Sequence, residues 1–501
     1  MILAAEKLRA ADLIAVVLDD GSFRSWDEAV PQGDVTAAYA GQLAEAAVRS
    51  GTDESLLTGE GTVRGRRVAV AVSEFGFLGG SIGQAAAGRL VAALERATRE
   101  GLPMLAAPSS GGTRMQEGTP AFVEMVAITA AVTRHKAAGL PYLVYLRNPT
   151  TGGVMASWGS LGHLTIAEPG ALLGFLGPKV YEALHGEPFP AGVQTAEHLF
   201  ERGIVDGVVP AKDLPELLDR ALRVLSPAPA TKRVPQTRFI PPPADPWDSV
   251  LKSRDRRRPG AARFLQYAAD DVVPLNGTGQ GEAASGLLLA LANVGGTGCV
   301  VLGQDRLGQL RRPLGPEAFR VARRGMRLAQ ELGLPLLTVI DTPGAALSRQ
   351  AEEGGLAGEI ARCVADLLTL DAPSVAVLLG QGCGGGALAL LPANRVIAAE
   401  HAWLSPLPLE GASVIMHRTP ARAAEMAHQQ RIAAPDLLAA GIVDVVVPEL
   451  PDAAREAEAF CRRLGEAVRG QFAELSARSG SHAPDRMRRY GRLSSGAAPL
   501  S

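Results

Sequence analysis

The chain has 501 residues, of which 47% are hydrophobic and 20% charged, so it is long enough for several globular domains. Its net charge of −2 excludes a general attraction to nucleic acid, and it has no run of about 18 uncharged apolar residues of the kind that spans a membrane. The four cysteines lack C-x-x-C spacing and the eight histidines lack H-x-x-x-H spacing, so we expect no metal site. The N-terminus is broken by charges, unlike a signal peptide, and we expect a cytoplasmic protein.

Strands and helices alternate along the first half. Residues 88–101 have the apolar spacing of a helix that ends at glycine, and the strand LPMLAAP follows them. This strand leads into the turn SSGGTRMQEG at residues 109–118. A second apolar strand, in PYLVYLRNPTTGGVMAS, comes before Gly152 and Gly153. Short apolar strands that alternate with helices predict an α/β fold with a buried sheet.

The second half repeats this order. A helix is expected over residues 316–333, followed by the strand LPLLTVI and the turn DTPGA. The next strand comes before Gly385 and Gly386. The spacing from Gly111 to Gly152 equals the spacing from Gly344 to Gly385, so both glycines correspond at an offset of 233.

Two further landmarks support a duplication. The strands LTIAE and VIAAE end at Glu168 and Glu400, an offset of 232. The phrase G-I-V-D-G-V-V-P at 203–210 returns as G-I-V-D-V-V-V-P at 441–448, an offset of 238. We therefore predict two related domains rather than one.

The predicted domains cover residues 1–225 and 248–501. Residues 226–247 join them and read as a linker, because their many prolines do not fit regular structure. The run RDRRR at 254–258 is expected to be a solvated face rather than a site for a polyanion. The polar tail after about Ser476 is expected to be loose at its end.

The glycine pairs stand at strand-to-helix turns. The first amides of a helix have no internal acceptor, and glycine lets a ligand approach closely, so two N–H groups could stabilise an oxyanion or enolate oxygen. Tight packing of helix on strand would explain the same glycines. The pattern G-x-G-x-x-G at 380–385 also meets the dinucleotide-binding fingerprint, but the first half lacks it, which disfavours that function.

The turns upstream of the glycine pairs could form the opposite wall of each pocket. Arg114 and Glu117 are three residues apart and could pair with each other or cap a local helix, and Asp341 could be an N-cap. The sequence contains neither the G-x-S-x-G nucleophile elbow nor the P-loop motif. Two candidate oxyanion sites without an evident nucleophile, metal or base predict a reaction whose substrates supply their own acid–base groups.

Several motifs resemble a known family. Five segments resemble the β-type carboxyltransferase of biotin-dependent acyl-CoA carboxylases: EFGFLGGSIGQAAAGRL (74–90), SSGGTRMQEG (109–118), PTTGGVMASWGSLG (149–162), IAEPGALLGFLGP (166–178) and AEHLFERGIVDGVVP (196–210). The α-type carboxyltransferase is similar to DTPGAALSRQAEEGGLAGEIAR (341–362), GQGCGGGALAL (380–390) and EGAS (410–413). LDDGSFRSWD at 18–27 resembles the N-terminal segment of the single-chain, fused carboxyltransferase subunits of actinobacterial acetyl/propionyl-CoA carboxylases.

This resemblance implies an α/β protein of two tandem crotonase domains from the ClpP/crotonase superfamily. It implies transfer of a carboxyl group from carboxybiotin to the α-carbon of an acyl-CoA, acetyl-CoA or propionyl-CoA, in fatty acid biosynthesis. In the family the biotin N1 is thought to take the α-proton, which fits the lack of a protein base. An A-M-K-M biotinylation site and an ATP-binding domain are absent from the sequence, so a biotin carboxylase and biotin carrier partner is expected, with a homo-oligomer such as a hexamer.

Motif matching also assigns roles to residues. Gly152 and Gly153 would hold the thioester enolate oxygen through their N–H groups, and Gly386 and Ala387 would hold the ureido oxygen of biotin. The residues expected to line the acyl-CoA side are Gly79, Gly80, Ser81, Ser110, Gly111, Gly112, Thr113 and Arg114. Those expected on the biotin side are Thr342, Pro343, Gly344, Ala345 and Gly385.

The sequence departs from the family pattern in one place. After DTPGA the family usually has an aromatic or apolar residue and then Pro-Gly, whereas this chain has Ala346, Leu347 and Ser348. Ala389 stands where the family lines the acyl pocket. Two alternatives therefore remain open: a non-catalytic scaffold paralogue of a carboxylase complex, and a biotin-independent malonyl-type decarboxylase.

Overall fold

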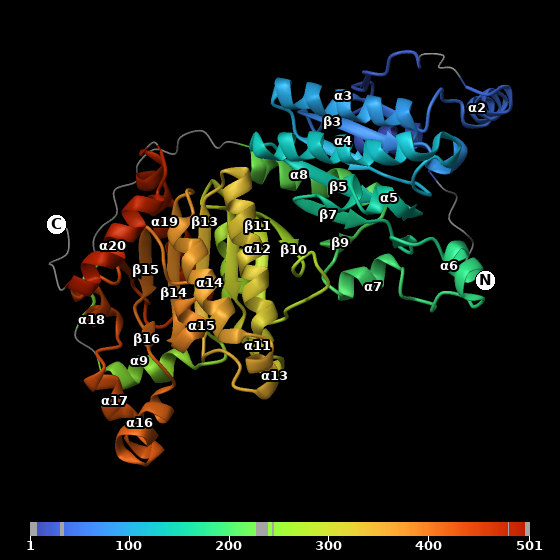
Figure 1. Ribbon diagram of the computed structural model, residues 1–501. Helices are drawn as coiled ribbons and strands as arrows, with labels where there is room; N and C mark the ends of the chain where they lie inside the picture. Colours follow the sequence, from blue (N-terminus) through green and yellow to red (C-terminus); the bar gives the residue numbers. More distant parts are fainter. Residues whose placement is uncertain (1–7, 31–34, 227–238, 243–244, 479, 496–501) are drawn as a thin grey trace. The chain divides into compact units, whose positions relative to one another are not determined.

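The computed structural model describes residues 8–30, 35–226, 239–242, 245–478 and 480–495 (Figure 1). The chain divides into two compact units: unit 1 is Met1–Leu222 with Gly279–Gly281, and unit 2 is Arg223–Thr278 with Glu282–Ser501. Much of the predicted linker at 226–247 lies outside the described residues. Its last residues are not a linker, because helix α9 begins at Pro246 with Asp245 as its N-cap.

Unit 1 is built on one mixed sheet in the order β1-β2-β3-β4-β5-β7-β9. Its strands are β1 (Arg24–Ser25), β2 (Leu56–Val63), β3 (Arg66–Ser73), β4 (Met104–Ala107), β5 (Tyr142–Leu146), β7 (Leu164–Ala167) and β9 (Gly207–Val208). The first three pair antiparallel, and the pairs from β3 to β9 are parallel. A separate parallel pair joins β6 (Thr150–Thr151) to β8 (Leu173–Gly174).

Helices cover the sheet of unit 1. They are α1 (Ala10–Val17), α2 (Ala37–Ser50), α3 (Gln84–Glu100), α4 (Gly118–Ala137), α5 (Gly152–Met155), α6 (Pro178–His185), α7 (Ala196–Glu201) and α8 (Leu214–Leu225), which crosses the division at Leu222. Figure 1 shows α3 and α4 side by side along the sheet. The predicted glycine stop of the first helix is confirmed, since Gly101 caps α3 in the left-handed conformation.

Unit 2 repeats the plan with the order β10-β11-β12-β13-β14-β15-β17. Its strands are β10 (Ala269–Leu275), β11 (Leu287–Val294), β12 (Thr297–Gln304), β13 (Leu336–Thr342), β14 (Ser374–Cys383), β15 (Arg395–Ala399), β16 (Trp403–Ser405), which pairs with β14, and β17 (Val445–Val447). Every residue of β13 and β14 is buried, as expected for parallel strands covered on both faces.

The helices of unit 2 include the second predicted one. They are α9 (Pro246–Ser253), α10 (Ala261–Ala268), α11 (Arg306–Arg311), α12 (Pro316–Leu332), α13 (Arg349–Glu353), α14 (Leu356–Thr369), α15 (Gly384–Leu388), α16 (Leu409–His417), α17 (Ala423–Gln429), α18 (Ala434–Ala439), α19 (Ala457–Ser476) and α20 (Ala483–Ser495). Gly333 ends α12 in the left-handed conformation, which confirms the prediction for 316–333.

The repeated phrase has a structural cause. The Asp206 carboxylate accepts the N–H of Thr165 at 2.8 Å, and the Asp206 N–H donates to the Thr165 carbonyl at 2.7 Å. Asp444 makes the same exchange with Val396, at 2.7 and 2.8 Å. In each unit this aspartate therefore holds the last segment of the sheet to the preceding strand. The phrase is repeated because both sheets end with the same hydrogen bonds.

Backbone conformation shows how the halves correspond. Gly112 and Gly344 have φ of 113° and 130°, and Gly152 and Gly384 have φ of 63° and 60°. Both pairs stand at an offset of 232, like Glu168 and Glu400. The predicted offset of 233 for the glycines is therefore wrong by one position, because matching by glycine identity chose the wrong member of each glycine run.

One expectation about a polar segment needs correction. The run at 254–258 is not a solvated face throughout, because Arg258 is fully buried and its Nη2 lies 2.5 Å from the Glu449 carboxylate. The tail after Ser476 forms α20, and the buried Arg486 on this helix donates to the carbonyls of Leu370 and Ala372. The end of the tail, residues 496–501, lies outside the described residues. In the part of the chain that is described, no helix is long and apolar enough to cross a membrane.

Candidate active site

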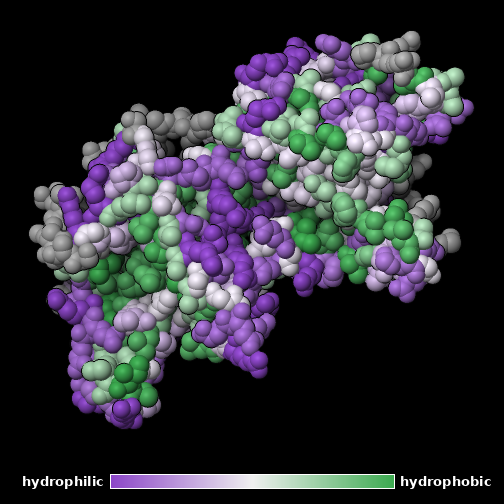
Figure 2. Space-filling view, viewed as in Figure 1, coloured by the Kyte–Doolittle hydropathy of each residue, from purple (hydrophilic) through white to green (hydrophobic). Residues whose placement is uncertain are grey.

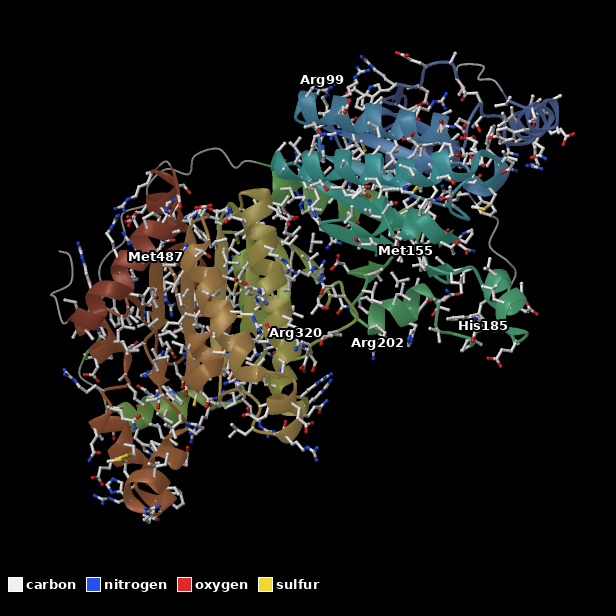
Figure 3. The ribbon with its side chains drawn as sticks, viewed as in Figure 1. Arg99, Met155, His185, Arg202, Arg320 and Met487 are labelled. Atoms are coloured by element: carbon white, nitrogen blue, oxygen red, sulfur yellow. The ribbon has the colours of Figure 1, made fainter. Side chains whose placement is uncertain are left out.

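The first glycine turn belongs to unit 1 and opens the short helix α5. The N–H of Gly152 donates to the Phe175 carbonyl at 2.9 Å, which continues the pairing of β6 with β8. The next two amides, of Gly153 and Val154, are the second and third of the helix, where an N–H has no acceptor within the helix itself. The prediction that Gly152 and Gly153 both donate to a ligand is therefore corrected: Gly152 is engaged, and the amides without an acceptor in the helix are those of Gly153 and Val154. Met155, which ends α5, is labelled in Figure 3.

The predicted acyl-CoA wall lies against this turn. A side chain on Gly152 would come within 3.2 Å of the Gly112 Cα, and both glycines have positive φ, so only glycine fits at this approach. Ser110 holds the wall in place, because its Oγ accepts the Gly112 N–H at 3.0 Å and its carbonyl accepts the Thr151 N–H at 2.9 Å. A side chain on Gly153 would meet the Thr113 Oγ1 at 3.1 Å.

The other predicted residues of this side form a second layer. Gly79 and Gly80 belong to the 3-10 turn η1 (Leu78–Gly80), and the Gly79 carbonyl accepts the Gly111 N–H at 3.0 Å. A side chain on Gly80 would overlap the Ser109 carbonyl at 2.0 Å, so the two segments touch through their backbones. The structure thus brings the predicted residues 79–81 and 110–113 together around the α5 turn.

Arg114 is a structural residue of this wall rather than an exposed cation. It is 1% exposed, and its guanidinium pairs with Glu54, 2.8 Å from Nη1 to Oε2. The predicted pair with Glu117 exists at 3.3 Å, but Glu54 is the closer partner and was missed because it is 60 residues away. Burial opposes the charge of Arg114, yet the hydrogen bonds and charge of Glu54 outweigh it and raise its pKa. Glu117 also caps α3 by accepting the Gln84 N–H at 2.6 Å.

The second glycine turn opens α15 in unit 2. The amides of Gly385 and Gly386, at the second and third helical positions, have no acceptor within the helix itself. Ala387 is the fourth residue, where hydrogen bonding within a helix begins. The amides of α15 without an acceptor in the helix are thus those of Gly385 and Gly386, which correspond to Gly153 and Val154 at the same offset of 232. The predicted donors, Gly386 and Ala387, are therefore one position too far along the chain, because the N–H of Ala387 is the first that bonds within the helix.

The loop that follows β13 forms the wall of this second turn. A side chain on Gly386 would come within 3.1 Å of the Ala345 nitrogen and 3.2 Å of the Gly344 carbonyl carbon. Thr342 shapes the loop as Ser110 does in unit 1, because its Oγ1 accepts the Gly344 N–H at 3.1 Å. The predicted residues Thr342, Gly344 and Ala345 are therefore placed around Gly386.

Asp341 is not an N-cap but a buried residue of β13. Its Oδ1 accepts the N–H of Gln381 at 3.1 Å, and its Oδ2 lies 3.7 Å from the Arg306 Nε. Burial raises the pKa of the Asp341 carboxyl, and Arg306 opposes this shift. Two buried glutamines that the sequence did not single out, Gln304 and Gln309, hydrogen-bond the main chain of Asp341.

A cavity of about 380 Å³ opens beside this loop in unit 2. Among the predicted site residues it contacts Pro343 alone. Its lining is Arg254, Arg256, Arg306, Leu307, Gln309, Leu310, Pro343, Gln381, Trp403, Pro408 and Glu410. The size suits a small ligand, and the walls combine apolar side chains with a few polar ones, as ligand sites commonly do.

The side chains around both turns offer little chemistry of their own. Among the described residues no group of three or more His, Cys, Asp or Glu side chains is placed to hold a metal ion. The four cysteines are buried and unpaired, and burial raises the pKa of each thiol to about 12, so none is a ready thiolate. Main-chain amides are therefore the functional groups that both turns present.

Comparisons with known proteins agree with this arrangement. The family model described as carboxyl transferase domain matches residues 3–478. The probable biotin-dependent acyl-coenzyme A carboxylase beta3 subunit of Mycobacterium tuberculosis is 59% identical over 485 residues, covering 95% of this chain and 97% of the relative. The acetyl-coenzyme A carboxylase carboxyl transferase subunits beta/alpha of Saccharopolyspora erythraea are 39% identical over 502 residues, covering 95% of this chain and 87% of that protein.

A solved structure shares the fold. The transcarboxylase 12S superposes with a TM-score of 0.71 at 23% identity, covering 92% of this chain and 90% of the other. The duplicated α/β fold and the match to the family model together define a carboxyltransferase. The chain belongs to the carboxyl transferase domain family, as the fused carboxyltransferase motifs predicted.

Proposed function

We propose that this chain is the carboxyltransferase subunit of a biotin-dependent acyl-CoA carboxylase and carboxylates the α-carbon of acetyl-CoA or propionyl-CoA. Two relatives that match nearly the whole chain carry names of this kind. The observation that carries the proposal is that the second and third amides of both α5 and α15, at Gly153 and Val154 and at Gly385 and Gly386, have no acceptor within their own helix. Residues 1–225 would serve the acyl-CoA and residues 248–501 the biotin.

These amides suit two oxygens that gain negative charge. In unit 1 the N–H groups of Gly153 and Val154 would stabilise the enolate oxygen of the thioester once the α-proton has left. In unit 2 those of Gly385 and Gly386 would hold the ureido oxygen of biotin. Both turns can admit a ligand closely because glycines form the facing walls.

The proton would not pass through a side chain of this protein. Within the described residues, no Asp, Glu, His or Lys side chain hydrogen-bonds either glycine turn, and the carbonyls of Gly153 and Gly386 take their hydrogen bonds from Ser157 and Gln304. Carboxybiotin carried on a partner would supply both the carboxyl group and, at N1 after the carboxyl group leaves, the base. The chain would bind, orient and stabilise charge.

The proposed reaction requires partners and a second copy. The family's two sites meet across a subunit interface, so we propose a cytoplasmic homo-oligomer, such as a hexamer, acting in fatty acid biosynthesis with a biotin carboxylase and carrier. Exposed apolar residues on each unit support an oligomer. In unit 1 they include Phe122 and Val126 of α4, which are 62% and 68% exposed. In unit 2 Figure 2 shows hydrophobic surface over α16, where Ile415 and Met416 are 63% and 65% exposed.

Reconstitution tests this function. The chain is mixed with biotin carboxylase, a biotinylated carrier, ATP and labelled bicarbonate, and acid-stable label is measured with acetyl-, propionyl- and longer acyl-CoA. We expect fixation that requires the chain, ATP and one of the two short acyl-CoA thioesters. An absence of fixation with every acyl-CoA would overturn the proposal, and co-purification with carboxylase subunits without fixation would favour the scaffold alternative.

A further inference from the structure

The turn of α15 is held by a side chain that lies far away in the sequence. Gln304, the last residue of β12, is fully buried, and its Nε2 donates to the Gly386 carbonyl at 2.6 Å. Its Oε1 accepts the N–H of Asp341 at 3.1 Å. The two contacts also fix the orientation of the Gln304 side-chain amide. If the amide were rotated by 180°, its NH₂ group would face the N–H of Asp341 and its oxygen would face the carbonyl of Gly386.

The Gly386 carbonyl needs this donor. The main-chain amides that follow α15 donate to other carbonyls: the N–H of Ala389 donates to the Gly385 carbonyl at 3.0 Å, and that of Leu390 to the Ala387 carbonyl at 3.1 Å. Residues 384–386 are three successive glycines, whose backbone would otherwise sample many conformations. A hydrogen bond to the middle of this helix therefore limits the direction in which the adjoining amides point.

The same glutamine ties α15 to the facing loop. Gln309 extends the connection, because its Nε2 donates to the Asp341 carbonyl at 3.0 Å and its Oε1 accepts the Thr342 hydroxyl at 2.6 Å. Gln304 and Gln309 thus fix the end of β13 on one side and Gly386 on the other. The gap between the Gly386 amide and the loop at Gly344 and Ala345 is set by this link.

In unit 1 the carbonyl that corresponds to that of Gly386 is held by a residue close in the sequence. The equivalent strand position, the last residue of β3, is Ser73, whose buried hydroxyl has no hydrogen-bond partner among the described residues. The Val154 carbonyl, which corresponds to that of Gly386 at the offset of 232, instead accepts the N–H of Ser157 at 3.3 Å, within the same chain segment. The long-range link through Gln304 is therefore special to unit 2 rather than a general requirement of the fold.

We infer that Gln304 is a positioning residue for carboxyl transfer, which aims the Gly385 and Gly386 amides at the ureido oxygen by holding the Gly386 carbonyl against the Asp341 loop. The inference rests on the proposed function and names a residue that sets its efficiency. Because Gln304 is fully buried, we expect it to act through the main chain rather than on a substrate. Its removal should lower the turnover of transfer and leave the KM for acyl-CoA, which is bound by unit 1, within about twofold.

Two substitutions separate positioning from packing. Gln304→Met keeps the length of the side chain but lacks the donor, whereas Gln304→Glu keeps the shape and gains a titratable group. When protonated, the carboxyl introduced by Gln304→Glu can donate to Gly386 and accept from Asp341, but its ionised form sets an oxygen against the Gly386 carbonyl. Burial raises the pKa of such a carboxyl, so the donating form should be reached at mildly acidic pH.

Charged groups near this position bear on that titration. The carboxylates to consider are Asp341 on β13 and Asp305, which follows Gln304 in the chain, and the cations that act on Asp341 are Arg306 and Arg258. The facing strand contributes Leu287, and α15 carries no titratable side chain. Because Asp341 can titrate in every variant, each rate is expressed as its ratio to the wild-type rate at the same pH.

The experiment measures transfer from a carboxylated, biotinylated carrier to acyl-CoA between pH 6 and 8.5, with the assembled chain. We expect Gln304→Met to lose at least about tenfold in kcat at all pH values, and Gln304→Glu to lose as much at pH 8.5 but recover towards pH 6. Gln330→Met is the control, because Gln330 makes an exposed contact with Asp371 away from the site. It should transfer at the wild-type rate.

Amide hydrogen exchange of residues 384–390 provides a second measurement that does not depend on activity. Exchange should quicken in Gln304→Met and, for Gln304→Glu, at pH 8.5 relative to wild type. Wild-type turnover in both variants, or a Gln304→Glu ratio that does not change with pH, would overturn the inference. If Gln304→Met does not fold, Gln304→Glu purified at pH 6 decides the matter alone. A wild-type chain inactive in transfer would instead overturn the proposed function.

Discussion

Gly152 donates its N–H to the carbonyl of Phe175 at 2.9 Å, so the first amide of α5 is unavailable to a ligand, whereas the next, that of Gly153, has no acceptor within the helix. Gly153→Pro removes this donor, and we expect carboxyl transfer to fall by about 10²–10³-fold, the usual loss for one oxyanion donor. Reconstituted fixation measures the rate, and size-exclusion chromatography checks that assembly is intact.

Gly153→Ala is the matched control for that substitution. It keeps the N–H but adds a methyl group 3.1 Å from the Thr113 Oγ1 and 3.4 Å from the Met125 Cγ, so a smaller loss is expected. Equal losses in the alanine and proline variants would show that crowding rather than the missing donor is responsible.

Gly386→Ala tests the biotin-side wall. The new Cβ would lie 3.1 Å from the Ala345 nitrogen, a main-chain atom that cannot turn away, so the loop must shift. We expect the kcat of transfer to fall with little change in the KM for acyl-CoA. Gly358→Ala, which meets only the flexible end of Arg362 at 3.2 Å, should behave like wild type in the same assay.

The pair of Arg114 and Glu54 predicts a large stability effect in unit 1. Both side chains are at most 2% exposed, so Glu54→Ala leaves a buried guanidinium without its main partner and should cost about 3–5 kcal/mol of unfolding free energy. Denaturant unfolding measures the loss. Glu95→Ala breaks the exposed pair with Arg134 and should cost less than about 1 kcal/mol; similar costs for both variants would contradict the structural role of Arg114.

His135 predicts acid sensitivity. Burial lowers the pKa of this imidazole from 6.5 to about 4, with Nε2 held 3.2 Å from the Pro141 carbonyl. Since the unfolded chain binds a proton near pH 6.5 and the folded chain only near pH 4, this contribution to stability is complete above pH 6.5 and lost as the pH falls to 4. The loss should reach about 3 kcal/mol. It is measured as the pH dependence of unfolding free energy, which should be flatter in His135→Gln.

The sequence predicted the regular elements well because their signals are local. The helices that end at Gly101 and Gly333, and the strands before each glycine turn, follow from apolar spacing and from glycine as a helix stop. The sequence also showed the duplication, because the phrase that contains Asp206 returns around Asp444. The two aspartates make the same hydrogen bonds in the two units. The family followed from dense motifs that the comparisons confirm.

What the sequence could not predict depends on contacts over distance. Glu54 and Gln304 reach their partners across 60 and 82 residues, and no spacing rule connects such positions. Glycine identity also misled the match between the halves by one position, because only the φ values tell which glycine of a run opens the helix. The engagement of the Gly152 amide was also unpredictable, because its acceptor is the carbonyl of Phe175, which no local pattern connects to it.

The most direct test of the account is the reverse reaction of the isolated chain. Malonyl-CoA or methylmalonyl-CoA is supplied with and without free biotin, and decarboxylation is measured. If the substrates supply their own acid and base across the two sets of amides at the starts of α5 and α15, release of CO2 should require biotin and should be lost in Gly153→Pro. Decarboxylation that proceeds equally well without biotin would contradict the account and favour a biotin-independent decarboxylase.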